Sequence, residues 1–473
     1  MKSEKLMDCI GQIDDRFIIE ADSLTNEADS IPAEAGIQAG KIKRVRRLWT
    51  MRASAGVAAA ACIIIAMSLL LNQPQQTGPD DLPDHTRPTV QADLPDLPKL
   101  PVNTELGSFG FEGYLAYDIS ELRNGNPWTE NNDLAVMPVF ANPHEYDGAG
   151  APVSGLSPEE LLAEAEKIAD LFGLEITSLY TEPTMEEIER IIQKMEAAGA
   201  SEEEIRQNAN IYRATAECNG AKIRVEKDGS IDLSLDQEMA HLAEEIGKLS
   251  VYESFRVSFD FRYKTTDGAI YFAGLPLPDG YRFTYANTSY EQALEATQYL
   301  LAEYGGFMGI KTPGYDLAAD YTFSGDLNRI YTSAFENAGS LTDRILNYNF
   351  RRLYFSATDL GGLGSIMYYN ADLSQKIGDY PVITAEEARK LLLEKHYITS
   401  VPEELPGEEY IARVELIYRT GRLDTVFMPY YRFLVEMPSM EMENGLKTFG
   451  AFYVPAVRSE YLENLPVWDG RFN

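Results

Sequence analysis

Residues 211–236 read IYRATAECNGAKIRVEKDGSIDLSLD, and this stretch decides the fold class of the chain. Its dipeptides Asn219-Gly220 and Asp228-Gly229 are typical of two-residue hairpin turns, whose backbone needs positive φ. Apolar residues alternate with polar ones on either side of the second turn: Ile223, Val225, Ile231, Leu233 and Leu235. The stretch therefore predicts a meander of three antiparallel strands: 211–218, 221–227 and 230–235.

Capping boxes predict helices on both sides of this meander. In such a box a Ser or Thr cap is followed three residues later by Glu or Gln. The box at Ser157 and Glu160 has a proline at the first helical position, and Gly173 ends the apolar pattern that follows it. Four further pairs have the same spacing: Thr184 and Glu187, Ser201 and Glu204, Ser289 and Gln292, Thr384 and Glu387.

Strand-like runs follow the last two of these helices. They lie around 328–336 and 347–370, and then at 410–419, 423–436 and 449–457. Three rounds of a helix followed by antiparallel strands predict an α+β fold of related units. The repetition is architectural, because no fixed period in residue identity accompanies it. We divide it into a first α+β region, 105–288, and a second, 289–473.

A transmembrane helix is predicted at Ala53–Leu71, a run without a single charged side chain. As a helix this run would extend about 28 Å, close to the ~30 Å hydrocarbon core of a bilayer. Basic residues precede it with no acid among them: Lys41, Lys43, Arg44, Arg46, Arg47 and Arg52. The positive-inside rule therefore places residues 1–52 in the cytoplasm and the chain after residue 71 outside the cell membrane.

Three other interpretations of the apolar run are open, and we favour an uncleaved span over each. A secretory signal peptide has a short basic start and a cleavage site, whereas residues 1–52 come first here and no A-x-A site closes the run. A lipoprotein signal would use Cys62, yet apolar residues continue well beyond it. A buried core helix gives no reason for the cluster of cations directly before the run.

The distribution of charge agrees with this topology. The formal net charge of the 473 residues is −33, from 74 acidic and 41 basic side chains. Residues 1–52 carry equal numbers of acids and bases, and Ala53–Leu71 carries neither, so the whole excess of acid falls on residues 72–473. Such a charge repels nucleic acid, which excludes DNA and RNA as expected partners.

Residues 72–104 are predicted to form an extended stalk, because prolines recur throughout the stretch. The cysteines Cys9, Cys62 and Cys218 lie before, inside and after the predicted span, so no two of them can form an intrachain disulfide. A large exported domain with one cysteine must be stabilised by packing, which is more typical of a bacterium than of a eukaryotic secretory route. We expect it to fold without disulfide or metal.

An amphipathic helix is predicted over residues 2–22. Its apolar stripe follows the spacing i, i+4, i+7 and i+11 and consists of Leu6, Ile10, Ile13 and Phe17. An isolated helix of this length is marginal in water, so the stripe needs a partner. Docking on the membrane surface is the alternative, but it favours basic residues on the polar face, and here that face is acidic. We therefore predict that this stripe binds a cytoplasmic protein.

No catalytic or cofactor-binding motif is present. The histidines are far apart in the sequence: His85, His144, His241 and His396. The chain contains no G-x-S-x-G, S-x-x-K, P-loop, G-x-G-x-x-G or C-x-x-C pattern. We therefore expect no catalytic residue, no cofactor and no metal site, and we predict that the chain is not an enzyme.

Two weaker patterns have a simpler explanation. A calcium loop is suggested by Asp228, Ser230, Asp232 and Asp236, but their spacing does not fit an EF-hand. Aromatic runs such as 430–433 and 452–453 could line a groove for a peptide or a glycan. We favour the alternative that they are half-buried strands, in which aromatic side chains pack well.

Residues 10–22, IGQIDDRFIIEAD, followed by a basic run and one span, resemble a group of single-pass membrane proteins of Clostridia-type Firmicutes. Many of these proteins are similar to anti-sigma factors of the extracytoplasmic-function class. The resemblance implies that the cytoplasmic partner is a sigma factor. The chain lacks the His-x₃-Cys-x₂-Cys pattern of zinc-binding anti-sigma domains, so that subclass is excluded.

The last part of the chain resembles bacterial regulatory ectodomains of the PepSY type and the proteins that restrain the essential cell-wall histidine kinase. The residues that carry this resemblance are 383–388 (ITAEEA), 414–418 (VELIY) and 429–433 (PYYRF). It implies binding or sensing rather than catalysis. We therefore expect a membrane-anchored regulator with an extracellular sensing domain. The alternative is a surface binding or scaffold protein whose cytoplasmic segment only orients it.

Overall fold

The computed structural model describes residues 96–104, 115–116, 125–132, 134–146, 152–201, 205, 212–251, 256–264, 270–271, 274–284, 288–321, 327–358, 361–440 and 447–471. All of them belong to one compact unit, Ala92–Asn473, called the folded unit below. The predicted span Ala53–Leu71 and the predicted partner-binding stripe lie outside the described residues. Within the described ranges, no helix is long and apolar enough to cross a membrane.

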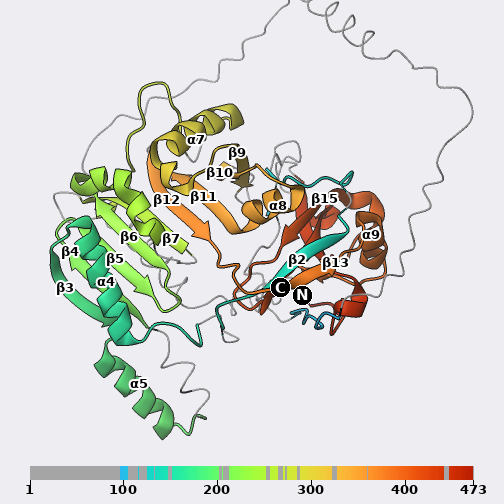
Figure 1. The fold of residues 1–473 in the computed structure, drawn as a ribbon, viewed down its shortest axis with the longest axis horizontal. Helices are drawn as coiled ribbons and strands as arrows, with labels where there is room; N and C mark the ends of the chain where they lie inside the picture. Colours follow the sequence, from blue (N-terminus) through green and yellow to red (C-terminus); the bar gives the residue numbers. More distant parts are fainter. Residues whose placement is uncertain are drawn as a thin grey trace, which may run out of the picture. The chain divides into compact units, whose positions relative to one another are not determined.

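The folded unit is α+β, as the sequence predicts (Figure 1). Its described α-helices are α4 (Pro158–Phe172), α5 (Met185–Ala197), α7 (Tyr290–Tyr304), α8 (Leu341–Phe350) and α9 (Ala385–Leu393). Its described 3₁₀ helices are η2 (Gln237–Val251), η3 (Gly306–Met308), η4 (Glu408–Tyr410), η5 (Pro438–Met440) and η6 (Ser459–Tyr461).

The largest sheet has the strand order β3-β4-β5-β6-β7-β12-β11-β10-β9, with β8 paired to β7. Its strands are β3 (Ile176–Glu182), β4 (Arg213–Cys218), β5 (Ala221–Glu226), β6 (Ile231–Asp236), β7 (Arg256–Lys264), β8 (Ile270–Tyr271), β9 (Pro313–Tyr321), β10 (Leu327–Glu336), β11 (Arg351–Ala357) and β12 (Leu363–Asn370). The pair β6 and β7 is parallel, and the other described pairs in this sheet are antiparallel.

Two smaller antiparallel sheets contain the other described strands. One has the order β1-β18-β17-β15, with β14 also paired to β18, and the other has the order β13-β2-β16. Their strands are β1 (Leu115–Ala116), β14 (Ile398–Thr399), β15 (Ile411–Tyr418), β17 (Pro429–Glu436), β18 (Thr448–Pro455), β2 (Val136–Ala141), β13 (Lys376–Pro381) and β16 (Val426–Phe427).

The predicted meander is present as β4, β5 and β6. Gly220 and Gly229 occupy the turns with φ values of 79° and 81°, a backbone conformation that glycine adopts without steric cost. Along β5 and β6 buried residues alternate with partly exposed ones, as the sequence pattern predicts. The predictions of the hairpin turns and of the buried face are therefore confirmed.

Four of the predicted capping boxes are confirmed. Ser157, Thr184, Ser289 and Thr384 each accept a hydrogen bond from the backbone N–H three residues later, and the side chain of that later residue bonds back to the cap. Gly173 ends α4 in the left-handed conformation. The predicted box at Ser201 ends on Glu204, which lies outside the described residues.

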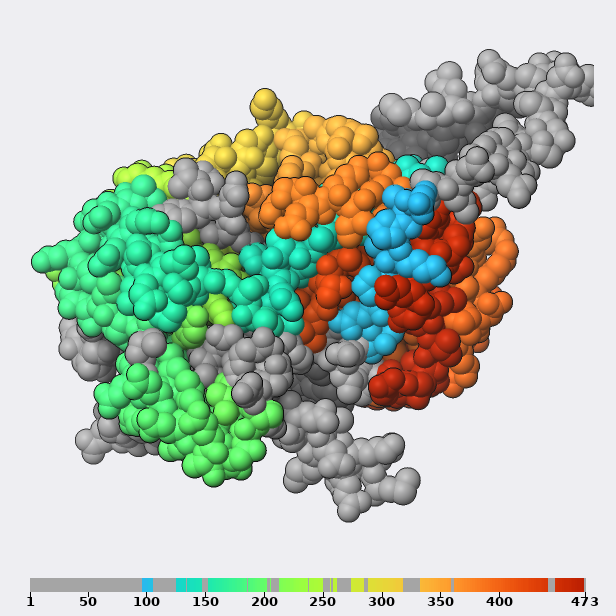
Figure 2. Space-filling view, turned by 60° about the horizontal axis from the view of Figure 1, so that its bottom comes forward, coloured from blue at the N-terminus to red at the C-terminus, as the bar shows by residue number. Residues whose placement is uncertain are grey.

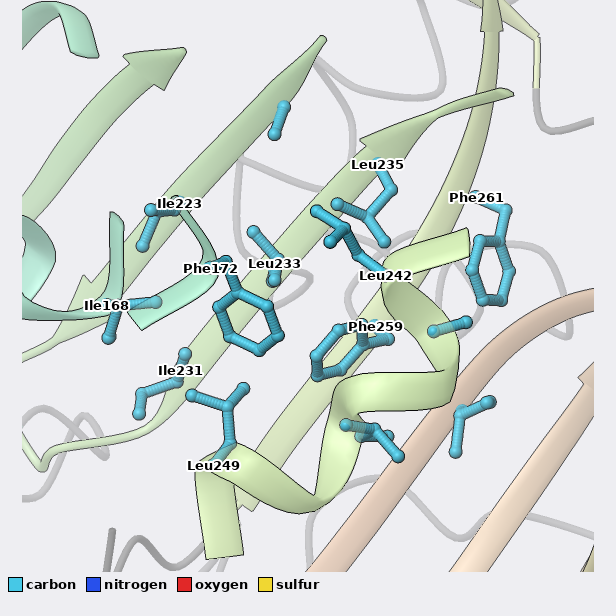
Figure 3. Packing of buried hydrophobic residues seen from close by; sticks show 14 of the residues in the cluster. Ile168, Phe172, Ile223, Ile231, Leu233, Leu235, Leu242, Leu249, Phe259 and Phe261 are labelled. Atoms are coloured by element: carbon cyan, nitrogen blue, oxygen red, sulfur yellow. The ribbon is translucent and has the colours of Figure 1, made fainter. Parts of the chain in front are cut away.

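The main hydrophobic core lies between the large sheet and the helices α4, η2 and α7. Figure 3 shows the part of it in which α4 and η2 meet the strands. Phe172 of α4 meets Phe259 of β7 edge to face, with ring centroids 5.9 Å apart. Leu242 and Leu249 reach this core from η2. Each fully buried side chain of this size stabilises the fold by about 1.5–3 kcal/mol, so the burial of Phe259 helps to hold β7 in the sheet.

Two predictions of strands were wrong in detail. Residues 341–350, which overlap the predicted strand 347–370, form helix α8, because Ser340 and Asp343 make a capping box in which Asp replaces the usual Glu or Gln. The predicted strand 423–436 is two strands in two sheets, β16 and β17. Several further strands were not predicted, among them β2, β3, β7, β9 and β13.

Helix α8 packs against strands of the large sheet and of the smaller sheets. Phe350 at its end packs against Tyr418 of β15 and Phe427 of β16, with centroid distances of 5.0 and 5.4 Å. Asn349 accepts a hydrogen bond from the backbone N–H of Tyr418 at 3.0 Å. The predicted regions 105–288 and 289–473 also share the large sheet, since β7 pairs with β12.

Candidate functional site

The chain enters the folded unit through residues 97–103, here called the anchor segment. This segment lies against residues 459–471, the C-terminal segment (Figure 2). The backbone of Leu100 donates to Tyr461 O at 2.8 Å and accepts from Glu463 N at 2.9 Å. The side-chain amide of Asn464 exchanges two hydrogen bonds of 3.0 Å with the backbone of Val102. The last residues of the predicted stalk are thus part of the folded unit.

The far end of the anchor segment is held by a buried ion pair. Arg419 and Asp424 pair at 3.3 Å, and their side chains are only 1% and 4% exposed. Arg419 donates to Asn103 O at 3.1 Å, and the Asn103 amide donates to Leu423 O at 2.7 Å. Burial raises the pKa of Asp424 to about 6, although Arg419 and the Gly421 N–H act in the opposite direction.

A cavity of about 210 Å³, here called the C-terminal cavity, opens beside the anchor segment. It lies between Thr104, which directly follows the anchor segment, the residues after α9 and the C-terminal segment. The residues that line it are Thr104, Tyr397, Ile398, Asn464, Leu465, Pro466, Val467, Trp468, Asp469 and Arg471. Val467 is 64% exposed, so an apolar side chain is left in water at this cavity.

The residues after α9 position the cavity wall. Lys395 adopts a left-handed backbone with φ of 65°, which turns the chain after the helix, and its carbonyl accepts from Trp468 N at 2.8 Å. His396 Nδ1 donates to Pro466 O at 3.0 Å. The ring of buried Tyr397 stacks on the Trp468 ring, with centroids 5.9 Å apart. These contacts fix the Trp468 side chain at the cavity.

Trp468 has a buried polar atom without a hydrogen-bond partner, its indole Nε1. The other described tryptophan, Trp128, donates the equivalent bond to Asn132 O at 2.9 Å. A buried donor without a partner costs about 1–3 kcal/mol, which an acceptor on a bound molecule would recover. The arrangement therefore suits a ligand that presents a hydrogen-bond acceptor.

The charged groups at this cavity compensate one another. Asp469 and Arg471 pair at 2.7 Å, and the bonds from Arg471 lower the pKa of the Asp469 carboxyl. Lys395 lies over the Trp468 ring, 5.5 Å from its centroid, and pairs with Glu404. A cavity with balanced charges favours a neutral ligand, because a charged one would bring an uncompensated charge into it.

The residues of the two weaker sequence patterns, the apparent calcium loop and the aromatic runs, take part in hydrogen bonds and packing. Asp228 accepts from the Tyr146 hydroxyl and from Ser230 N at 3.0 Å each, and Asp232 pairs with Arg256. The aromatic side chains of runs 430–433 and 452–453 lie in β17 and β18, as the strand interpretation predicts, but they are fully buried rather than half-buried. Within the described residues, no group of three or more His, Cys, Asp or Glu could hold a metal ion.

Sequence reasoning did not find the C-terminal cavity. Its key residue, Trp468, lies in irregular chain and belongs to no motif, and its partner Tyr397 lies far away in the sequence. The proline at 466 and the glycine at 470 were the available signals, since they mark chain that neither helix nor strand would use.

Comparison with known proteins identifies no family for this chain. No protein-family model matches the chain, and neither a curated protein nor a solved structure matches it.

Proposed function

We propose that this chain is a membrane-anchored regulator whose folded unit binds a small neutral extracellular ligand in the C-terminal cavity. The observation that carries the proposal is the buried, unpartnered indole N–H of Trp468, a residue that lines the cavity beside the anchor segment. Amide carbonyls are strong neutral acceptors, and short peptides and N-acetylated sugars both present them. A ligand of this chemistry would accept the Trp468 bond and cover Val467.

The anchor segment would couple the binding of such a ligand to the membrane-anchored part of the chain. Asn464 lines the cavity and also holds the backbone of Val102. Residues 72–96 join that segment to the predicted span Ala53–Leu71, which the basic cluster before it orients with the N-terminus inside. A ligand that favours one arrangement of Asn464 therefore changes how firmly the stalk is held.

A fluorine NMR titration tests ligand binding. The full-length protein, labelled with 5-fluorotryptophan, has three tryptophans, Trp49, Trp128 and Trp468. We expect N-acetylglucosamine or N-acetylalanine methylamide, both uncharged, to shift the Trp468 resonance while the Trp128 resonance stays in place. Trp468→Phe keeps an aromatic ring but removes the donor, so an affinity measured by calorimetry should fall about tenfold.

The matched control for this titration is Trp128→Phe, whose affinity should equal that of the wild type. If neither probe moves the Trp468 resonance at high millimolar concentration, the cavity does not bind amides and the proposed ligand is wrong. Equal affinity of Trp468→Phe and wild type would contradict the role of the indole N–H.

The repeated architecture expected from the sequence belongs to the same proposal. Of the three predicted rounds, two have the same order of elements: α4 precedes the meander β3 to β6, and α7 precedes the meander β9 to β12, with a helix inserted in each. This order supports a relation between these two units. Superposition of the two units in an experimental structure tests the relation. Different spatial orders of helix and strands would contradict it.

The cytoplasmic side of the proposal rests on the stripe Leu6, Ile10, Ile13 and Phe17. Each large apolar side chain buried at an interface contributes roughly 1.5–3 kcal/mol, so Ile13→Asp should weaken partner binding at least about tenfold. Asp15→Ala should have a smaller effect. The measurement is the amount of cytoplasmic protein, a sigma factor above all, that co-purifies with the full-length chain.

Membrane orientation is the control for this experiment. An impermeant thiol reagent should leave Cys9 unlabelled in intact cells, for the wild type and for Ile13→Asp alike. If the double variant Ile10→Asp, Ile13→Asp leaves every cytoplasmic interaction and every transcript unchanged, the chain is not a regulator. A surface binding or scaffold role would then replace it.

A further inference from the structure

A second hollow, of about 430 Å³, lies on residues that the C-terminal cavity does not use. It is formed by the loop before α7 and by one side of α7 itself. The residues that line it are Asp279, Gly280, Tyr281, Glu295, Gln298 and Tyr299. None of them belongs to a motif in the sequence, and none lines the C-terminal cavity, although Tyr299 also packs against the main core.

Two tyrosine rings form one wall of this hollow. Tyr281 lies on Tyr299 with ring centroids 4.7 Å apart and an interplanar angle of 33°. Tyr281 is nevertheless 40% exposed, so part of a large ring remains open to water. The face of an aromatic ring carries partial negative charge and attracts a cation within about 6 Å of its centroid.

The polar side chains of the hollow have the same sign. Asp279 and Glu295 are acids, and no Lys or Arg is among its described lining residues. Burial, the Glu303 carboxylate one turn further along α7 and the Tyr281 hydroxyl together raise the pKa of Tyr299. The hollow is therefore a place of negative potential with two tyrosine rings in its wall.

We propose that this hollow binds an alkylammonium group. A tyrosine face and two carboxylates match a cation that also carries apolar carbon, whereas Ca²⁺ or Mg²⁺ needs about six or more oxygen ligands around it. An anion is excluded by Asp279 and Glu295. A neutral sugar could stack on Tyr281 but would leave both carboxylates unmatched. The ligand class is thus a primary or quaternary amine, such as a lysine side chain or a choline group.

Ligand-observed NMR on the full-length protein in a maltoside detergent tests this site. The probes are choline, n-butylamine and 3,3-dimethylbutan-1-ol, the neutral isostere of choline. We expect saturation transfer to both cations and none to the neutral alcohol. Tyr281→Leu keeps apolar surface but removes the ring, and it should weaken choline binding about fivefold. Glu295→Gln should weaken it through the lost charge.

Glu386→Gln, an exposed acid on α9, is the matched control and should bind choline like the wild type. Equal transfer to the alcohol and to choline would overturn the proposal, because the rings would then be a simple apolar surface. So would unchanged choline binding in Tyr281→Leu and Glu295→Gln. The result is independent of the Trp468 experiment, since the two sites share no residue.

Discussion

Asp316→Ala should lower the free energy of unfolding by about 3 kcal/mol. Asp316 on β9 pairs with Arg352 on β11, and each side chain is only 12% exposed. Arg352 also donates to Ser333 Oγ of β10 at 3.2 Å and stacks over the ring of Tyr348, 4.7 Å from its centroid. Arginine cannot lose its proton in a protein, so removal of Asp316 leaves a largely buried charge without its counter-ion.

Asp316 has a second role that adds to this loss, because its carboxylate accepts from Gly125 N at 2.8 Å. The pair Arg352→Met with Asp316→Leu should recover most of the stability, since it removes both charges together. Urea unfolding of the full-length protein, followed by circular dichroism, gives the free energies. The matched control is Lys390→Ala in the exposed pair with Glu386, which should change stability by less than about 0.5 kcal/mol. A loss below 1 kcal/mol for Asp316→Ala would show that the charge of Arg352 is solvated.

Local structure was predictable wherever a few adjacent residues determine it. Asn219-Gly220 and Asp228-Gly229 define their turns because each glycine adopts positive φ. Caps such as Ser157 with Glu160 were predictable because both partners lie within one turn of chain. Helix α8 was missed for the same local reason, since Asp343 in its box is a shorter acid than the pattern requires.

The pairing of distant strands was not predictable. β6 and β7 are parallel, and β7 pairs with β12 across the predicted boundary at 288 and 289. No turn residue specifies either pairing, because long stretches of chain separate these strands. Packing selects them instead, through Phe259 and the other side chains that meet only in the folded core. A division of the folded region into two parts by sequence alone therefore could not anticipate the shared sheet.

The candidate sites were even less predictable from the sequence than the strand pairing. Trp468 and Tyr281 are single aromatic residues in irregular chain, and the chain contains many aromatic side chains. What distinguishes Trp468 is an unpartnered N–H, and what distinguishes Tyr281 is its exposed face beside acids. Both properties depend on which neighbours the fold supplies. The sequence pattern contains neither of them.

Leu100→Asp should destabilise the folded unit by about 4 kcal/mol or more. Leu100 is 1% exposed and packs in a cluster with Tyr380 and Tyr453. The substitution loses the burial of a leucine side chain, which is worth roughly 2–5 kcal/mol in core positions, and places a carboxyl group among apolar side chains without a partner. Among substitutions in the anchor segment, this one should have the largest effect, because Leu100 lies at the centre of the segment. The backbone of Leu100 also makes two of the hydrogen bonds that hold the segment.

Lys99→Asp is the matched control, since it introduces the same acid one residue earlier at an exposed position. Its melting temperature should stay within about 1–2 °C of the wild type, because surface substitutions change stability little. Limited proteolysis of the full-length protein separates a local effect from a global one. Rapid cleavage within residues 96–104 of Leu100→Asp, before any cleavage in β17 or β18, would mean that the stalk detaches while the sheets stay folded. An unchanged melting temperature in Leu100→Asp would contradict the anchor, and a coupling of the C-terminal cavity to the membrane through Val102 and Asn464 would then lose its physical basis.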